Sequence, residues 1–135
     1  MKWNEQRDLL LSKAAEDDSA MAILARTGGT SDAIIGFHAQ QAVEKYLKAL
    51  LCHLQVSYDR THDLVVLLDA LTDAGCAVPT EVDNCKYLQP YAVQFRYDDI
   101  PAGARNSLDR VRAQQDVEAA KRWVTRLIAR GVHNP

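Results

Sequence analysis

A group of polar side chains recurs at helical spacing in the segment GFHAQQAVEKYLKALL, residues 36–51. Residues that are three, four or seven positions apart lie on one side of an α-helix. Lysine and glutamine side chains gathered on one side suit contacts to phosphate groups or to base edges. The pattern therefore indicates a polar groove for an anionic ligand or a partner, formed by His38, Gln41, Glu44, Lys45 and Lys48.

The same segment has a simpler interpretation as an amphipathic helix with one solvated face. Glu44 and Lys48 are four residues apart, and such a pair stabilises a helix by only about 0.3–0.5 kcal/mol. A neighbouring sector is apolar and is expected to pack inward; its residues are Ile35, Ala39, Ala42, Tyr46, Ala49 and Leu50. On the pattern alone, the solvated face is the simpler of the two interpretations.

His62 and Asp63 stand together in the segment RTHDLVVLLDAL, where a third helix is expected to begin. A histidine beside a carboxylate can act as a general acid or base near neutral pH. The alternative is structural, with both side chains binding the free N–H groups at the start of that helix. The helix start itself favours the capping role, and His62 remains a candidate catalytic residue.

Arg96 and Tyr97 follow later, in the segment FRYDD. An arginine can hold a phosphate group through two hydrogen bonds, and it can equally form an ion pair with Glu44 or Asp63 that ties helices together. If Arg96 lies near the two lysines, a cationic pocket results beside Tyr97, which could stack on a base. Arg96 is the second candidate catalytic residue.

The net charge bears on whether the chain could bind nucleic acid over its whole surface. The net charge is −2 and the pI is about 6.0, so the chain as a whole lacks the basic footprint of a nucleic-acid-binding protein. The charge is unevenly spread, which leaves room for a local basic patch between residues 105 and 130, where the basic residues are Arg105, Arg110, Arg112, Lys121, Arg122, Arg126 and Arg130.

No metal or cofactor is expected. The three cysteines have no metal-like spacing and are interpreted as reduced thiols, and Gly28-Gly29 lacks the Lys-Ser/Thr sequence of a phosphate loop. The chain has no apolar run long enough to span a bilayer and no secretory signal at its start. A cytoplasmic protein without membrane contact is therefore expected.

The elements that must position these residues are all helical. Hydrophobic periodicity predicts five helices, at about residues 3–26, 30–54, 61–74, 79–97 and 114–130. Thr61 is expected to cap the third helix, Thr80 and Asp83 to form a shortened capping box in the fourth, and Pro90 to kink or break the fourth. The predicted fold is an all-α, up-and-down bundle of four to five helices, forming a single domain over residues 1–135.

The blocks FHAQQAVEKYLKALL, RTHDLVVLLDAL and FRYDD, in that order, resemble the HEPN domain (higher eukaryotes and prokaryotes nucleotide-binding). The resemblance covers nearly the whole chain. It implies a bundle of four or five helices, often dimeric, that binds a nucleotide or RNA. It also implies a nucleotidyltransferase-like partner in a toxin–antitoxin type system. The residues expected to bind nucleotide are Gln41, Glu44, Lys45, Lys48, His62, Asp63, Arg96 and Tyr97.

Many HEPN domains are metal-independent ribonucleases whose hallmark is an arginine followed, after four to six residues, by a histidine. Here no histidine follows Arg96 at that distance, and residues 101–103 are Pro-Ala-Gly. One formal match, from Arg126 to His133, runs through Gly131 at the end of the chain and is interpreted as chance. The resemblance therefore favours a binding module, with an endoribonuclease toxin and a pure protein-interaction module as alternatives.

Overall fold

The computed structural model describes residues 2–92 and 108–131. These residues form helices and their connections, without any β-strand. The elements are α1 (Trp3–Thr27), α2 (Asp32–His53), α3 (Leu64–Asp73), α4 (Thr80–Asp83), the 3₁₀ helix η1 (Asn84–Ala92) and α5 (Arg110–Ala129). The predicted all-α bundle is confirmed.

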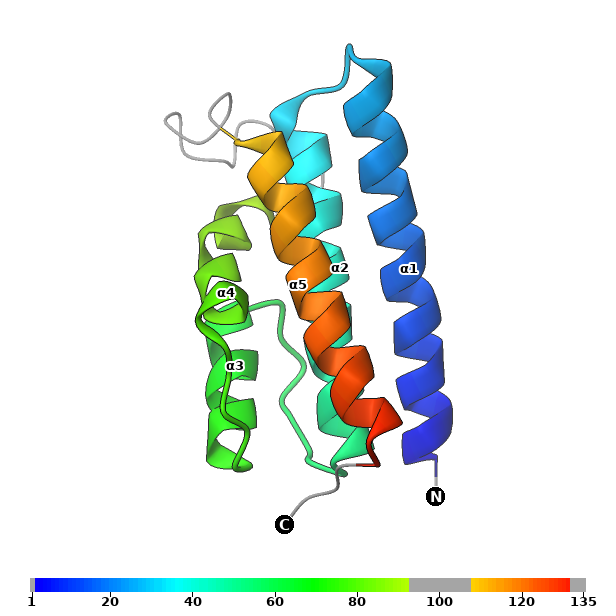
Figure 1. Cartoon of the computed structure of the whole chain (residues 1–135), viewed down its shortest axis with the longest axis vertical. Helices are drawn as coiled ribbons and strands as arrows, with labels where there is room; N and C mark the ends of the chain where they lie inside the picture. The colour runs from blue at the N-terminus through cyan, green and yellow to red at the C-terminus, as the bar shows by residue number, and fades with distance from the viewer. Residues whose placement is uncertain (1, 93–107, 132–135) are drawn as a thin grey trace.

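Helix α2 lies at the centre of the bundle. It packs against α1, α5, η1 and α3, and most of its residues are buried. The long helices α1 and α5 lie along α2, while α3, α4 and η1 form a second group beside it (Figure 1). A helix surrounded in this way must be apolar on several faces, so its polar residues are drawn into contacts with neighbouring elements.

The connection between α2 and α3 matters for the site. After α2 ends, residues 54–63 return along the bundle, so that α3 begins beside the middle of the molecule and runs in the same direction as α2 (Figure 1). This return interrupts the simple alternation of helix directions. It also carries His62 back to the middle of α2, opposite Glu44.

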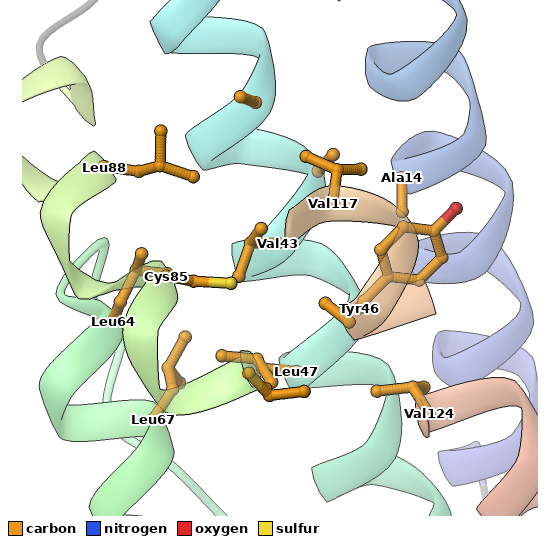
Figure 2. Packing of buried hydrophobic residues seen from close by; sticks show 14 of the residues in the cluster. Ala14, Val43, Tyr46, Leu47, Leu64, Leu67, Cys85, Leu88, Val117 and Val124 are labelled. Atoms are coloured by element: carbon orange, nitrogen blue, oxygen red, sulfur yellow. The ribbon is translucent and has the colours of Figure 1, made fainter. Parts of the chain in front are cut away.

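The core is built around α2, which is apolar on several faces, and the surrounding elements pack apolar side chains against it (Figure 2). The apolar sector predicted for α2 is buried throughout, from Ile35 to Leu50, and Val117, Ala120 and Val124 form the buried stripe of α5. Burying a leucine such as Leu47 completely stabilises the fold by roughly 1.5–3 kcal/mol relative to an exposed one. This packing fixes the rotation of α2 about its axis and hence the position of its polar side.

Two predicted helix starts are wrong. The third helix is capped by Asp63, not by Thr61: the Asp63 carboxylate accepts a hydrogen bond from the backbone N–H of Val65 at 2.9 Å. The fifth begins at Arg110 rather than Gln114, because Asp109 caps it by accepting from the N–H of Arg112 at 3.0 Å. In both cases the helix starts just after an aspartate, because the aspartate carboxylate accepts a hydrogen bond from an N–H group that the first turn leaves free.

The predicted fourth helix is also corrected. Its α-helical part is only the four residues of α4, and Thr80 is the first helical residue, with no side-chain cap at its start. The chain then continues as η1, which contains Pro90. Proline disrupts α-helical hydrogen bonding, and where a kink or a break was expected the chain runs on as a 3₁₀ helix of nine residues. The predicted end of this helix, near Tyr97, lies outside the described residues.

Candidate functional site

The polar side of α2 is buried, so the interpretation as a solvated face is wrong for its central residues. Gln40 is 0% exposed, Gln41 9% and Glu44 2%. The predicted pair between Lys48 Nζ and the Glu44 carboxylate forms, at 3.0 Å. Buried polar groups are stable only when they are hydrogen-bonded, and these residues bond to one another within α2 and to His62 in the connection beside it.

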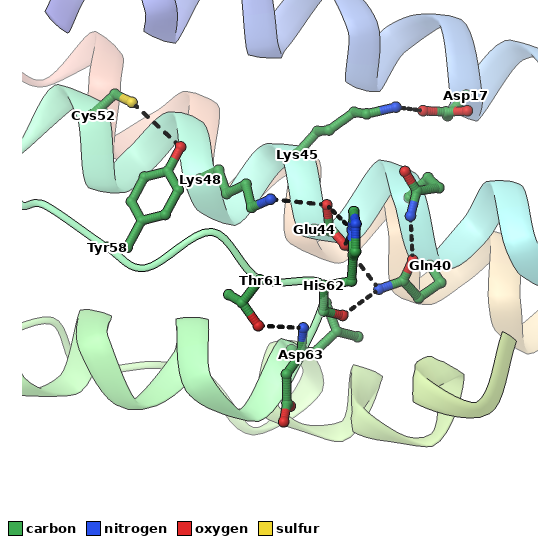
Figure 3. Close-up of polar contacts among 12 residues, drawn as sticks. Asp17, Gln40, Glu44, Lys45, Lys48, Cys52, Tyr58, Thr61, His62 and Asp63 are labelled. Carbon is green, nitrogen blue, oxygen red and sulfur yellow. Dashed lines mark hydrogen bonds and ion pairs between the residues drawn. The ribbon is translucent and has the colours of Figure 1, made fainter. Parts of the chain in front are cut away.

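Glu44 is the centre of the cluster (Figure 3). Its carboxylate accepts hydrogen bonds from Lys48 Nζ at 3.0 Å, from Gln40 Nε2 at 3.2 Å and from His62 Nδ1 at 3.0 Å. Both carboxylate oxygens accept hydrogen bonds: Gln40 donates to Oε1, Lys48 donates to Oε2, and His62 Nδ1 lies within 3.2 Å of both. A buried carboxylate with this many donors is well compensated for its loss of water.

His62 has its backbone fixed and its ring in solvent. The His62 carbonyl accepts from Gln40 Nε2 and from Gln89 Nε2, each at 3.0 Å, so α2 and η1 hold it from two sides. The side chain is nevertheless 69% exposed. Because a carboxylate accepts hydrogen bonds, Nδ1 donates to Glu44. The other ring nitrogen, Nε2, has no partner among the described residues and is open to a ligand.

A second set of polar contacts joins α2 to α1. Lys45 Nζ pairs with the Asp17 carboxylate, and His38 Nδ1 lies 2.9 Å from the other oxygen of Asp17. Gln41 belongs with the first cluster, because its Nε2 donates to the Gln40 side-chain oxygen at 2.7 Å. The polar face of α2 is thus divided between two carboxylates, and each predicted lysine already has an acidic partner.

The aromatic ring of Tyr58 borders the cluster. Lys48 Nζ lies 5.8 Å from its centroid, and the Tyr58 hydroxyl lies 3.9 Å from the sulfur of Cys52. Burial raises the pKa of both the tyrosine and the cysteine above their usual values. Both groups therefore stay protonated at neutral pH and offer neither a phenolate nor a thiolate for chemistry.

The sequence-predicted residues are brought together only in part. Glu44, Lys48 and His62 meet between α2 and the connection beside it, whereas Lys45 points toward α1 and pairs with Asp17 (Figure 3). Gln41 joins the Glu44 cluster only through Gln40. Asp63 points away toward α3, which it caps. The structural alternative for this pair thus holds for Asp63, whereas the His62 side chain binds Glu44 instead of capping the helix. Arg96 and Tyr97 lie outside the described residues.

Three contributors were not among the predicted site residues. Asp17 comes from α1, Gln89 from η1, and Gln40 from the helix turn before Glu44. Gln40 could have been found, since it precedes Glu44 by four residues on the same face. Asp17 and Gln89 carry no local signal, because their contacts depend on how separate helices pack.

Cysteines and other metal-binding side chains form no centre in the part of the chain that the structure describes. Cys52, Cys76 and Cys85 are not joined in disulfides. No group of three or more His, Cys, Asp or Glu side chains is placed to hold a metal ion within residues 2–92 and 108–131.

A family model for the HEPN domain matches residues 8–132, nearly the whole chain. The chain belongs to the HEPN family. Membership supports a nucleotide- or RNA-related role for this helical module, and HEPN proteins often dimerise. No curated protein and no solved structure gives a significant match. Across the described residues of this HEPN protein, the helices are too short or too polar to cross a membrane.

Proposed function

We propose that this HEPN protein binds a nucleotide or an RNA strand at the surface around His62. The observation that carries the proposal is an imidazole that is 69% exposed yet held at Nδ1 by a buried carboxylate. Its Nε2 can accept a hydrogen bond from a ligand or, when protonated, donate one to a phosphate oxygen. The exposed ring face also suits stacking on an unpaired base.

The other predicted contacts support this role unequally. Lys48 places positive charge near His62, but its ammonium group is held by Glu44, and Lys45 is held on the α1 side of α2 by Asp17. They therefore attract an anion without having free donors directed at it, and the affinity should depend most on the imidazole. Arg96 and Tyr97 remain proposed contributors from the segment after η1.

The proposed setting follows from the family resemblance. The protein is proposed to act as a homodimer, in the cytoplasm, with a nucleotidyltransferase-like partner in a toxin–antitoxin type system. Co-purification with the product of a neighbouring gene would test the partner. Sedimentation equilibrium of the purified chain would test the dimer.

A second candidate function is metal-independent RNA cleavage. It is favoured by the same pair, because a carboxylate that orients Nδ1 leaves Nε2 free to move a proton as a general acid or base. The arginine–histidine hallmark of the family's ribonucleases is not found in the expected place, so any cleavage would have to depend on His62 rather than on that motif.

Thermal shift with defined ligands tests the binding proposal. ATP, GTP, their monophosphates and a short RNA would each be added without metal and then with magnesium. A ligand at 100 times its Kd stabilises the native state by about 2.7 kcal/mol. A clear rise in Tm with one ligand is expected. No rise with any of them would contradict the proposal and favour the interaction module.

Two variants separate ligand contact from structure. His62→Asn keeps an amide donor near the position of Nδ1 and removes the ring with its Nε2. It should retain the unliganded Tm and lose the ligand shift. His62→Ala should lower both, because it also removes a donor from Glu44. An unchanged ligand shift in His62→Asn would refute the assigned site, and RNA cleavage abolished in His62→Asn would establish the second candidate.

A further inference from the structure

A hollow lies between the start of α4 and the second half of α5, away from Glu44. Its volume is about 260 Å³. It is lined by Pro79, Glu81, Ala119, Arg122, Trp123 and Arg126, none of which belongs to the cluster around Glu44. The side chains that give it chemical character are two arginines on one helix face and a tryptophan between them in the sequence.

Arg122 and Arg126 are free of the pairing that occupies the other described arginines of α5. Arg110 binds Asp32 at 2.7 Å, and Arg112 lies 3.4 Å from Asp116. Arg122 and Arg126 are both exposed, and neither has an ion-pair or hydrogen-bond partner in the part of the chain that the structure describes. Their guanidinium groups are permanently charged. Because neither is in an ion pair within the described residues, each can bind an anion without first breaking a contact to a carboxylate.

The hollow and the end of α5 beside it carry a net positive charge. From Lys121 to Arg130 the helix and its C-cap hold four basic residues and no acidic one. Glu81 lines the hollow opposite the arginines and carries its only carboxylate. One negative charge offsets one of the two arginines, and the hollow keeps a net positive charge. Two of the basic residues noted between residues 105 and 130, Arg122 and Arg126, therefore line this hollow.

We propose that this hollow is a second binding site, which takes a phosphate group. Residues four apart on a helix are about 6 Å apart along its axis, so two guanidinium groups can approach one phosphate from either side. Each guanidinium presents paired N–H donors that match phosphate oxygens. The phosphate can come from inorganic phosphate, a mononucleotide or the backbone of an RNA strand. The site does not depend on binding at His62.

Trp123 provides a local reporter for the test. The chain has two tryptophans, Trp3 and Trp123, so Trp3→Phe leaves only the one that lines the hollow. Its emission would be followed during titration with inorganic phosphate, AMP and a short single-stranded RNA. A saturable change is expected for at least one of them. Calorimetry on the unchanged protein gives a second readout that does not rely on the Trp3 substitution.

Charge variants decide whether the arginines are responsible. Arg122→Gln and Arg126→Gln should each weaken binding about tenfold, as expected for one charge-assisted hydrogen bond. Lys121→Gln removes the same charge from a neighbouring exposed residue that does not line the hollow, and should leave affinity within about twofold if contact, not overall charge, decides. Glu81→Gln should tighten binding. Circular dichroism melts would confirm that the variants fold.

The ligand source follows from the titrations. For RNA, the slope of log K against log salt should become shallower by about 0.7 for each arginine removed, as for single-stranded nucleic acids. His62→Asn should leave the ligand-dependent change in Trp123 emission unchanged. A failed test of the hollow can therefore be told apart from a failed test of the site at His62. The proposal is overturned if no ligand changes the emission or heat, if the double arginine variant binds normally, or if a polyglutamate peptide binds more tightly than every phosphate ligand.

Discussion

Replacing Glu44 by glutamine should destabilise the protein far more than an ordinary helix-surface change. The side chain keeps its size but loses the charge that Lys48 Nζ and His62 Nδ1 contact, each at 3.0 Å. The new amide also turns an N–H₂ group toward donors. Lys48, whose side chain is 13% exposed, is then left as a poorly compensated cation.

The magnitude follows from burial. Removing one partner of a fully buried ion pair costs about 3–5 kcal/mol. Here the cost should be lower, about 2–4 kcal/mol, because Lys48 is not fully buried and the 69% exposed His62 can turn to water. For a chain of this length, each kcal/mol corresponds to roughly 3–5 °C in Tm. Glu44→Gln should therefore lower the Tm by about 10 °C.

A double-mutant cycle with Lys48→Met isolates the pair. Methionine matches the length of the lysine stem and removes the charge. If Glu44 and Lys48 interact in a buried setting, the double variant should be more stable than the sum of the single effects predicts, by at least about 1 kcal/mol. A solvent-exposed i,i+4 pair would give only about 0.3–0.5 kcal/mol. The coupling energy thus distinguishes the buried cluster from a solvated face.

Urea unfolding followed by circular dichroism would supply the free energies by linear extrapolation. The tyrosine or tryptophan fluorescence transition must coincide with it if the unfolding is two-state. A loss below about 0.5 kcal/mol for Glu44→Gln, the range of ordinary surface substitutions, would refute the reasoning. So would a coupling energy no larger than that of an exposed pair.

Three further predictions concern the rest of the bundle. Gly36→Ala should destabilise the bundle by about 1–3 kcal/mol despite the better helix propensity of alanine, because the new Cβ would lie 2.4 Å from the Tyr91 ring. Urea unfolding would measure the loss of stability. Tyr91→Leu should relieve the clash. Asp18→Asn should raise stability at neutral pH, because burial raises the Asp18 pKa above 3.8. In the native protein this carboxyl favours folding while protonated, and that contribution is lost as the pH rises through its folded pKa. The gain from Asn should therefore disappear on acidification, as pH-dependent melts would reveal. Cys85 should resist alkylation until the protein unfolds, because it is fully buried and burial raises its pKa to about 12; mass spectrometry after iodoacetamide labelling across a urea series would measure this.

Sequence periodicity was sufficient for the number and type of the main helices. Helices α1 and α2 begin and end within a few residues of their predicted bounds, because long amphipathic segments and the Gly28-Gly29 break give strong local signals. The predicted bounds failed where several residues compete to cap one helix. Thr61 and Asp63 both have capping side chains, and tertiary contacts at His62 set the start of α3 at Leu64.

The site was harder to predict than the fold. The i,i+4 relation between Glu44 and Lys48 is visible in the sequence, and the pair forms. Whether the pair lies in water or in the interior is decided by the return of residues 54–63 and by η1, which cover that side of α2. Such coverage joins distant parts of the chain, so no local pattern encodes it.

The division of charge on α2 limits how an anionic ligand can bind there. A phosphate that displaced Glu44 from Lys48 would leave part of a buried carboxylate without a donor, and an unsatisfied buried group costs about 1–3 kcal/mol or more. A phosphate that displaced Asp17 from Lys45 would face a similar penalty, since the Asp17 side chain is only 13% exposed. His62 can bind a ligand through Nε2 while Nδ1 keeps its contact with Glu44. The imidazole is therefore the group in this cluster that gains a contact without losing one, and its removal should affect ligand affinity more than removal of either lysine.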